Sequence, residues 1–251
     1  MFEAKLASAA LLKKIVEAVK DLITDAPFDC TENAFSLQAM DSSHVALVSL
    51  NLASSLFEIY RCDRTINIGM SFASMAKALK CANNDDTCMI RYEEDDDVVF
   101  AFEDTKRGRT QEVTVRMMDI DNEHLGIPDQ EHSAVVTMSS GDFQKTCRDL
   151  AMFSDSVLIT VTKAGIGFTG KGETGSSVSV TVTVTEPVSV TFSVKYMNHF
   201  AKASSLSDRV KLSMTNELPI VVEYPIDDDS TSYLRFFLAP KIQEDEEGMN
   251  E

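Results

Sequence analysis

Basic side chains recur at helical spacing in four short stretches of the sequence, a pattern that suits phosphate binding. Lys13 and Lys20 are seven residues apart, so both lie on one face of a predicted helix. Lys77 and Lys80 are three residues apart and share a face in the same way. The four stretches together hold nine basic residues: Lys13, Lys14, Lys20, Lys77, Lys80, Lys145, Arg148, Lys195 and Lys202. The sequence therefore predicts one basic stripe on each of four helices.

The rest of the chain is strongly acidic. It has 40 acidic and 23 basic residues, and its net charge of −17 repels nucleic acid on average. The four stretches contain nine basic but only four acidic residues, which leaves 14 basic and 36 acidic residues elsewhere. A single basic helix face is usually just solvated, but four of them in an acidic chain favour phosphate contact. With no tryptophan and no helix rich in Arg, Asn and Gln, we expect nonspecific, salt-sensitive contact with the DNA backbone.

Candidate catalytic and metal-binding motifs do not fit their required spacing. The glycine-rich run at 170–176 lacks the GxxxxGK[ST] order of a phosphate-binding loop and is predicted to be a turn. Asp119, Asp121 and Glu123 alternate as calcium ligands would, but His124 stands where such a loop needs glycine. The four histidines, His44, His124, His132 and His199, are scattered. We therefore expect no cofactor, metal or catalytic activity; a hydrolase that uses scattered histidines and carboxylates is the enzyme alternative.

The cysteines and the N-terminus bear on the compartment. Five cysteines without CxxC spacing indicate neither a disulfide framework nor a zinc site, which favours a reducing compartment. The start, MFEAKLASAALLKK, has Glu3 before its apolar run and two lysines after it, so it is predicted to be an amphipathic helix of the mature protein. No apolar stretch approaches the roughly 20 residues of a membrane span. A soluble protein with no membrane partner is expected.

Apolar spacing predicts an α+β protein with two similar halves. Helices are predicted over residues 8–21, 71–80, 142–153 and 195–206. Strands are predicted at 35–40, 45–50, 65–68, 88–92, 98–102, 112–117, 157–161, 166–169, 178–184, 188–192, 210–213, 220–224 and 233–238. The order of helix, strands, helix, strands occurs twice, which predicts domains at 1–117 and 133–242. Residues 118–132 are the predicted connecting loop and 243–251 a mobile acidic tail.

Several strings of the sequence carry a family resemblance that runs in order from end to end. They are QAMDSSHVALVSL (38–50), YRCDR (60–64), SMAKALKCANNDD (74–86), MDIDNEHLGIP (118–128), CRDL (147–150), SLSDRVKLSM (205–214), LPIVVEYPI (218–226) and FFLAPKI (236–242). Together they closely resemble the eukaryotic DNA sliding clamps of the proliferating cell nuclear antigen family.

This resemblance implies a fold and a function. The expected fold is a DNA-clamp fold, with antiparallel sheets outside and four helices on the inner face, assembled head to tail as a homotrimer. The expected function is that of a non-enzymatic processivity factor, which encircles duplex DNA and recruits a clamp loader, DNA polymerase, flap endonuclease and DNA ligase through short peptide motifs. A nuclear location follows from the family alone, because Lys106–Arg109 is too short to establish import.

The resemblance also implies functional residues. Those expected to face DNA are Lys13, Lys14, Lys20, Lys77, Lys80, Arg148, Lys195 and Lys202. Those expected to bind partner peptides are Met40, His44, Val45, Leu125, Ile127, Pro128, Pro219, Phe237, Leu238, Ala239, Pro240 and Ile242. Lys163 matches the lysine that receives ubiquitin or a related modifier.

Three positions depart from the family pattern. Met152 stands where many relatives carry histidine, and His132 stands where an aromatic residue is common. Between Gly172 and Pro187 the chain is too short for the two strands and acidic loop usual there, and one of those strands normally pairs with the next subunit across the edge at 110–117. The alternative is therefore a divergent paralogue with weak or hetero-oligomeric ring closure that acts as a regulator.

Overall fold

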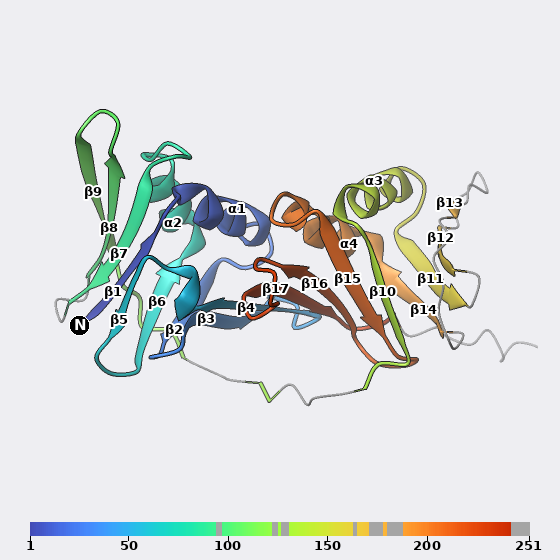
Figure 1. The fold of residues 1–251 in the computed structure, drawn as a ribbon. Coiled ribbons are helices and arrows are strands. Elements are labelled where there is room, and N and C mark those ends of the chain that lie inside the picture. The colour runs from blue at the N-terminus through green and yellow to red at the C-terminus, as the bar shows by residue number, and fades with distance from the viewer. Residues whose placement is uncertain are drawn as a thin grey trace, which may run out of the picture.

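The described residues form three antiparallel sheets and four α-helices, with the helices on one side of the sheets (Figure 1). The structure, a computed structural model, describes residues 1–93, 97–121, 125–126, 131–162, 165–170, 178–179 and 188–241. Figure 1 shows the helices along the upper side of the strands. No helix in the described ranges is long and apolar enough to cross a membrane. This arrangement confirms the predicted α+β class.

The described elements follow the predicted order of helix, strands, helix and strands in each half, except that each half begins with a strand. The first half contains β1 (Phe2–Leu6), α1 (Ala9–Val19), β2 (Asp25–Cys30), β3 (Ala34–Met40), β4 (Ala46–Ala53), the 3-10 helix η1 (Ser54–Leu56), β5 (Ile59–Cys62), β6 (Ile66–Ser71), α2 (Phe72–Leu79), β7 (Thr87–Tyr92), β8 (Asp97–Asp104) and β9 (Arg109–Arg116). The second half contains β10 (Ala134–Ser139), α3 (Ser140–Ala151), β11 (Ser156–Thr162), β12 (Gly165–Thr169), β13 (Val178–Ser179), β14 (Val188–Ser193), α4 (Val194–Ala201), the 3-10 helix η2 (Lys202–Ser205), β15 (Arg209–Met214), β16 (Ile220–Pro225) and β17 (Tyr233–Leu238).

One sheet joins the two halves of the chain. Its strand order is β10-β15-β16-β17-β4-β3-β2-β6, and β4 pairs with β17 from Asn51↔Tyr233 to Ala46↔Leu238. The other sheets, β5-β1-β7-β8-β9 and β13-β12-β11-β14, lie at opposite ends of the molecule (Figure 1). Alternate residues, such as Leu50 and Phe236, are buried beneath the helices. The halves therefore share a continuous core.

The two halves repeat the same backbone contacts at their helix starts. The N–H of Ala9 in α1 donates to the carbonyl of Asp86 at 2.8 Å, and the N–H of Ser140 in α3 donates to that of Asp208 at 3.0 Å. The first N–H groups of α2 and α4 bond to the residues just before β2 and β11, at 2.9 and 3.1 Å. These bonds satisfy N–H groups that have no partner within the helix. The repeat predicted from element order is thus present at the level of hydrogen bonds.

The predicted N-terminal helix is wrong for its first residues. Phe2–Leu6 form β1, whose side chains alternate between buried and half-buried and whose backbone pairs with both β5 and β7. The helix begins only at Ala9, where the Ser8 hydroxyl accepts the N–H of Ala10 at 3.1 Å. Five residues are too few for a period to separate strand from helix, and pairing on both sides decides the outcome.

Sequence patterns also fail to predict β2, β5 and β10. In β2, two aspartates and Pro27 are poor strand formers. Pro27 has no N–H, and pairing of β2 with β3 begins only at Phe28, whereas pairing with β6 covers the whole strand. A strand with partners on both sides therefore forms despite unfavourable propensity.

Two further predictions need correction or lie partly outside the described residues. The helix predicted at 195–206 ends at Ala201 and continues as the tighter helix η2, where two consecutive serines disfavour an α-helix. Of the strand predicted at 178–184, the structure describes only Val178–Ser179.

At the start of the connecting loop, Met118 pairs with Gly69 of β6. The carbonyl of Met118 lies so close to Gly69 that a side chain at position 69 would have no room for its Cβ.

Candidate nucleic-acid and peptide interfaces

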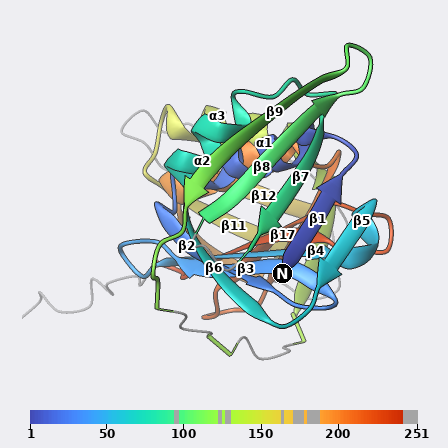
Figure 2. The ribbon, with the colours of Figure 1, turned by 90° about the vertical axis from the view of Figure 1, so that its left-hand side faces the viewer.

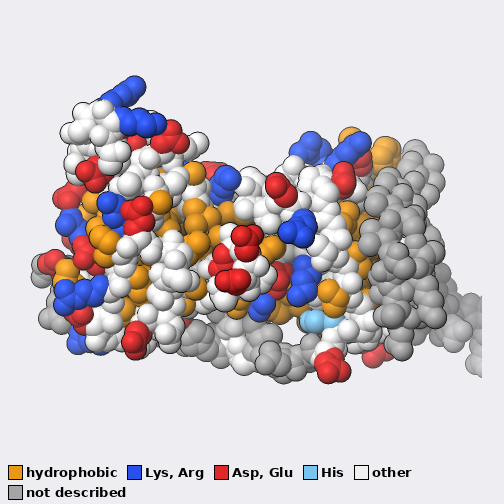
Figure 3. Space-filling model, viewed as in Figure 1, with side chains coloured by type: hydrophobic (Ala, Val, Ile, Leu, Met, Phe, Trp, Pro, Cys, Tyr) orange, Lys and Arg blue, Asp and Glu red, His pale blue; other side chains and the backbone are white. Residues whose placement is uncertain are grey.

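The basic residues predicted to face DNA lie on the helices or at their ends, away from the sheets. Two of them, Lys13 and Lys20, are half-buried. The other six are exposed: Lys14, Lys77, Lys80, Arg148, Lys195 and Lys202. Figure 3 shows basic side chains along the upper edge, over the helical side of the molecule. Within the described residues, Lys14, Lys77, Lys80 and Lys195 have no ion-pair partner. Such free cations can contact phosphate without breaking an existing bond.

Two of these lysines are held by neighbouring groups. The Nζ of Lys13 donates to the carbonyl of Ala82 at 2.6 Å, so Lys13 fastens α1 to the segment after α2. The Nζ of Lys20 lies 2.7 Å from Glu17, one turn earlier, and this hydrogen bond raises the pKa of Lys20. We therefore expect Lys13 and Lys20 to contribute less to phosphate contact than the free lysines.

Lys202 connects the two halves on the helical side. Its Nζ donates to Asp21 at 2.6 Å, which lowers the pKa of that carboxyl. A cleft of about 490 Å³ beside it is lined in part by Lys195, His199 and Lys202. Burial lowers the pKa of His199, as do the two lysines, while Asp21 opposes them. The cleft is thus a basic surface containing a neutral histidine.

On the sheet face opposite the helices, an apolar row crosses four strands. The register pairs Met40 with Leu47, and Leu47 with Phe237. Phe237 in turn pairs with Val221 on β16. Neighbouring residues such as Phe236 point into the core, so Phe237 faces outward and is half-buried. Leu47 and Val221 are missing from the predicted site because only the register of distant strands reveals them.

The carboxylate of Asp41 organises the turn between β3 and β4, beside this row. One oxygen accepts the N–H groups of Val45 at 2.9 Å and Ala46 at 2.7 Å. The other accepts the N–H of Ser43 at 3.1 Å and the hydroxyl of Tyr196 at 2.7 Å. Burial alone would raise the pKa of Asp41, but these hydrogen bonds outweigh it and the pKa is lowered. An ionised Asp41 therefore fixes the turn and ties it to α4.

Other predicted peptide-binding residues lie beside the row. The carbonyl of Val45 accepts the N–H of Ala239 at 3.1 Å, which brings the β3–β4 turn next to the segment after β17. The N–H of Leu125 donates to the side chain of Gln38 on β3 at 2.7 Å. Val45 and Leu125 are large apolar residues that are 38% and 43% exposed. The structure thus gathers Met40, Val45, Leu125, Phe237 and Ala239 around one apolar surface.

The remaining residues of the predicted peptide site differ in position. Leu238 is fully buried in the core and does not face this surface. His44 and Pro219 are exposed, and Pro240 is half-buried. Ile127, Pro128 and Ile242, as well as the modification candidate Lys163, lie outside the described residues. His132 is half-buried, and burial together with Lys211 lowers its pKa.

The two ends of the molecule carry terminal strands. β9 ends the five-stranded sheet and β13 ends the four-stranded sheet, far apart in Figure 1. A cleft of about 570 Å³ runs along β9 and α2, with Cys81, Val113 and Met117 in its lining. At the other end, beyond α3, Met152 and Phe153 are 67% and 44% exposed. Both ends therefore present apolar side chains beside an edge.

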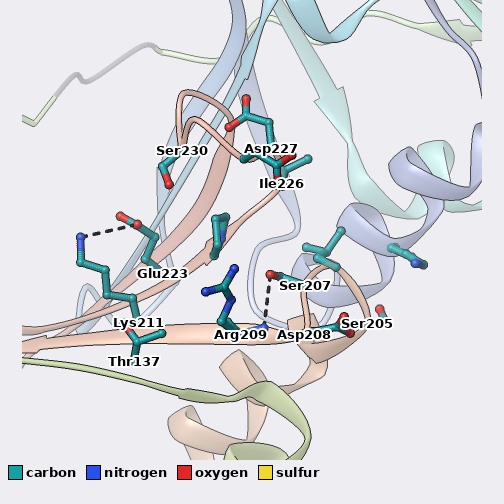
Figure 4. Close-up of a pocket in the computed structure, with 14 residues that line it drawn as sticks. Thr137, Ser205, Ser207, Asp208, Arg209, Lys211, Glu223, Ile226, Asp227 and Ser230 are labelled. Atoms are coloured by element: carbon teal, nitrogen blue, oxygen red, sulfur yellow. Dashed lines mark hydrogen bonds and ion pairs between the residues drawn. The ribbon is translucent and has the colours of Figure 1, made fainter.

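A polar cleft of about 530 Å³, shown in Figure 4, lies between the 226–230 loop and β15. The buried carboxylate of Glu223 lies 3.8 Å from the Nζ of Lys211 and 2.5 Å from the Nε of Arg235. Its negative charge is therefore paired with two cations. No histidine or cysteine is among its described lining residues, and the described chain holds no metal-ligand cluster. The hydrolase alternative gains no support from this cleft.

Comparison with known proteins gives matches over nearly the whole chain. Residues 1–124 match the family model for the N-terminal domain of proliferating cell nuclear antigen, and residues 126–241 match the model for its C-terminal domain. The proliferating cell nuclear antigen of Caenorhabditis elegans is 64% identical over 262 aligned positions, which cover 98% of this chain and 99% of the relative. Because this alignment is longer than the chain's 251 residues, some residues of the relative have no counterpart here.

Proposed function

This chain belongs to the proliferating cell nuclear antigen family, and on that premise we propose that it forms a homotrimeric ring around duplex DNA and acts as a DNA polymerase processivity factor. At the level of the family it is a non-enzymatic sliding clamp of DNA replication and repair. The family's name supports a nuclear location, which we propose for this chain.

One observation carries the proposal: the basic helices lie on one side of a chain whose terminal strands lie at opposite ends (Figure 1). If β9 of one copy pairs with the β13 region of the next, the contact is head to tail and closes when the rotation per copy permits. Three copies then place twelve helices around a central hole. Weak phosphate contacts allow sliding, while the closed ring prevents escape.

The apolar row on the outer face supports partner recruitment. A short helical peptide with one aliphatic and two aromatic anchors would bury Phe237, Val45 and Leu125, which are otherwise left partly exposed. We propose that the clamp loader, DNA polymerase, flap endonuclease and DNA ligase dock there. Ile127, Pro128 and Ile242 remain predicted members of this surface, and Lys163 a predicted modification site.

The first test of the ring is the mass of the protein in solution. Light scattering is measured from micromolar to nanomolar concentration. We expect the mass of three chains, maintained on dilution, because apolar contact and strand pairing at each end stabilise the same interface. A monomer over the whole range would contradict the homotrimeric ring.

The regulator alternative rests on the sequence alone, because the segment between Gly172 and Pro187 is short for the family. Most of this segment lies outside the described residues, and its predicted partner in the neighbouring copy is β9, which is eight residues long. A short opposing strand offers fewer backbone hydrogen bonds to its neighbour. A trimer that dissociates readily on dilution would favour this alternative and still leave peptide binding intact.

A further inference from the structure

The turn between β8 and β9 carries a cluster of basic residues outside the helices. Lys106, Arg107 and Arg109 occupy three of four consecutive positions in a chain of net charge −17. The side chains of Lys106 and Arg107 are 82% and 81% exposed. Neither the helices nor the peptide surface includes this cluster, so the proposed function gives it no role.

The turn is held in a defined shape. Asp104 pairs with Arg109 across the hairpin, which leaves four residues in the loop. One carboxylate oxygen of Asp104 accepts the N–H groups of Lys106 at 3.0 Å and Arg107 at 3.2 Å. Gly108 has φ of 62°, a left-handed conformation that favours glycine and lets the chain return into β9. The basic side chains thus project from an ordered tip.

Nearby carboxylates only partly offset these cations. Asp104 lies 3.8 Å from Arg107 but is largely turned into the loop, where it accepts backbone N–H groups. Asp85 lies 4.0 Å from Lys106, and both side chains are more than 80% exposed, so water screens the pair. Arg109 bonds to the neutral side chain of Gln111 at 2.7 Å. The outermost charges of the tip are therefore positive.

The position of the tip relates it to the helical face. Figures 1 and 2 show, from perpendicular directions, that the β8–β9 hairpin extends past the helices on the same side as α1 and α2. Figure 3 shows its basic side chains at the upper left, separate from those over α3. We propose that this tip is a second phosphate-binding surface, which contacts the backbone of the DNA duplex beside the helices. The inference rests on the proposed DNA-encircling function.

The chemistry of the tip favours DNA over a protein partner. Thr105 and Gly108 are the other loop residues, so no large apolar side chain could act as the anchor that a protein interface usually needs. Lysine and arginine on a rigid loop suit phosphate oxygens, which arginine can bind with two parallel hydrogen bonds. Contact would be independent of base sequence and would add to the salt dependence of binding.

The test measures affinity of the full-length protein for a short duplex across a series of salt concentrations. The tip variant is Lys106→Gln/Arg107→Gln; Arg109 is kept because it begins β9, the proposed subunit edge. Each lost phosphate contact lowers the slope of log affinity against log salt by about 0.9, so we expect a decrease of up to about 1.8. Affinity at low salt should fall at least about fivefold.

Three matched variants make the result specific. Arg61→Gln/Arg64→Gln, in and just after β5 below the helices in Figure 1, removes the same charge and should leave the slope unchanged. Lys106→Arg/Arg107→Lys keeps the charge of the tip and should keep the wild-type slope. Lys77→Gln/Lys80→Gln removes charge from the helical face and should lower the slope. A normal slope in the tip variant with a lowered slope in the Lys77/Lys80 variant would overturn this inference alone. Normal slopes in both variants would overturn the proposed DNA-facing surface as well. Equal decreases in the β5 variant and the tip variant would mean that only the net charge of the protein matters, which would also overturn this inference.

Discussion

The helical face and the apolar row on the opposite sheet face are suited to ligands of different kinds, which the proposed function assigns to DNA and to partner peptides. On the helices, exposed lysines such as Lys77 and Lys80 end in free ammonium groups with no ion pair among the described residues. On the sheet, Met40, Leu47 and Phe237 are fixed side by side by strand register. In the proposed function, the first surface would make weak contacts that exchange during sliding, and the second would hold one bound geometry.

The two faces are nevertheless joined by a direct contact. The hydroxyl of Tyr196, on α4, donates to Asp41 at 2.7 Å, and Asp41 holds the turn that carries Val45. Lys195 is the neighbour of Tyr196 in sequence and belongs to the basic face. A disturbance of α4 could therefore reach the apolar row through a single hydrogen bond.

The largest expected effect comes from removing an aromatic residue from the apolar row on the sheet face. Phe237→Ala should weaken binding of a synthetic peptide with one aliphatic and two aromatic anchors by about 30-fold or more, since a buried aromatic anchor contributes about 2 kcal/mol or more. Tyr233→Ala is the matched control, because Tyr233 lies on the same face of β17 but two rows away. Binding is measured by calorimetry. Equal losses in both variants would indicate damage to the strand and not a local anchor.

Sequence periodicity predicts the basic face better than the apolar row, because helical stripes are local. Lys77 and Lys80 fall on one face of α2 whatever surrounds it. Leu47 and Phe237 become neighbours only when β4 pairs with β17, and a shift of one residue would turn either side chain into the core. Sequence patterns cannot fix that register. The peptide site implied by the family resemblance includes the buried Leu238 and omits Leu47.

The same distinction explains the other missed features. The contact between Asp41 and Tyr196 joins residues 155 positions apart, and no local pattern marks either one. β2 contains Pro27 and two aspartates, so its own propensity argues against a strand, yet partners on both sides form it. Local signals predict that the four helices exist and that they are basic, although not all of their ends. Pairing over long sequence distances decides the rest.

The second largest effect comes from removing lysines from the helical face. Lys20→Ala/Lys77→Ala/Lys80→Ala should slow clamp-dependent DNA synthesis and leave peptide affinity unchanged. Because Lys20 is already bonded to Glu17, the Lys77/Lys80 double variant should account for most of the change, roughly tenfold in duplex affinity. Loading and sliding are followed on singly primed DNA. If the triple variant loads and slides normally, the helices do not form the DNA-facing surface.

A smaller effect tests the contact between the faces. Tyr196→Phe removes the hydroxyl that donates to Asp41 and should weaken peptide binding only a few-fold, since three backbone N–H groups still hold the turn. Asp41→Ala removes all four bonds and should weaken it more, with a loss of stability of about 1–3 kcal/mol. Peptide affinity and thermal unfolding are measured together. Equal effects of the two variants would show that the turn does not depend on the carboxylate.

The smallest effect uses two histidines as reporters of the two faces. The pKa of His199 is lowered by burial and by Lys202 and Lys195, and that of His132 by burial and Lys211. Just below pH 6.5, therefore, both histidines are still neutral in the folded protein, whereas the histidines of the unfolded chain already bind protons. They destabilise the fold as pH falls below about 6.5 towards their folded pKa values.

Duplex DNA should separate the two reporters. Phosphate close to Lys195 and Lys202 would favour the protonated imidazole, so the pKa of His199 should rise when DNA binds. The pKa of His132 should stay constant, because Lys211 lies on the sheet face opposite the helices. NMR titration of the histidine ring protons, assigned with His199→Gln and His132→Gln, measures both. A rise at His132 with none at His199 would place DNA on the wrong face of the molecule, whereas a rise at His199 alone would show that the helices sense phosphate while the peptide surface does not.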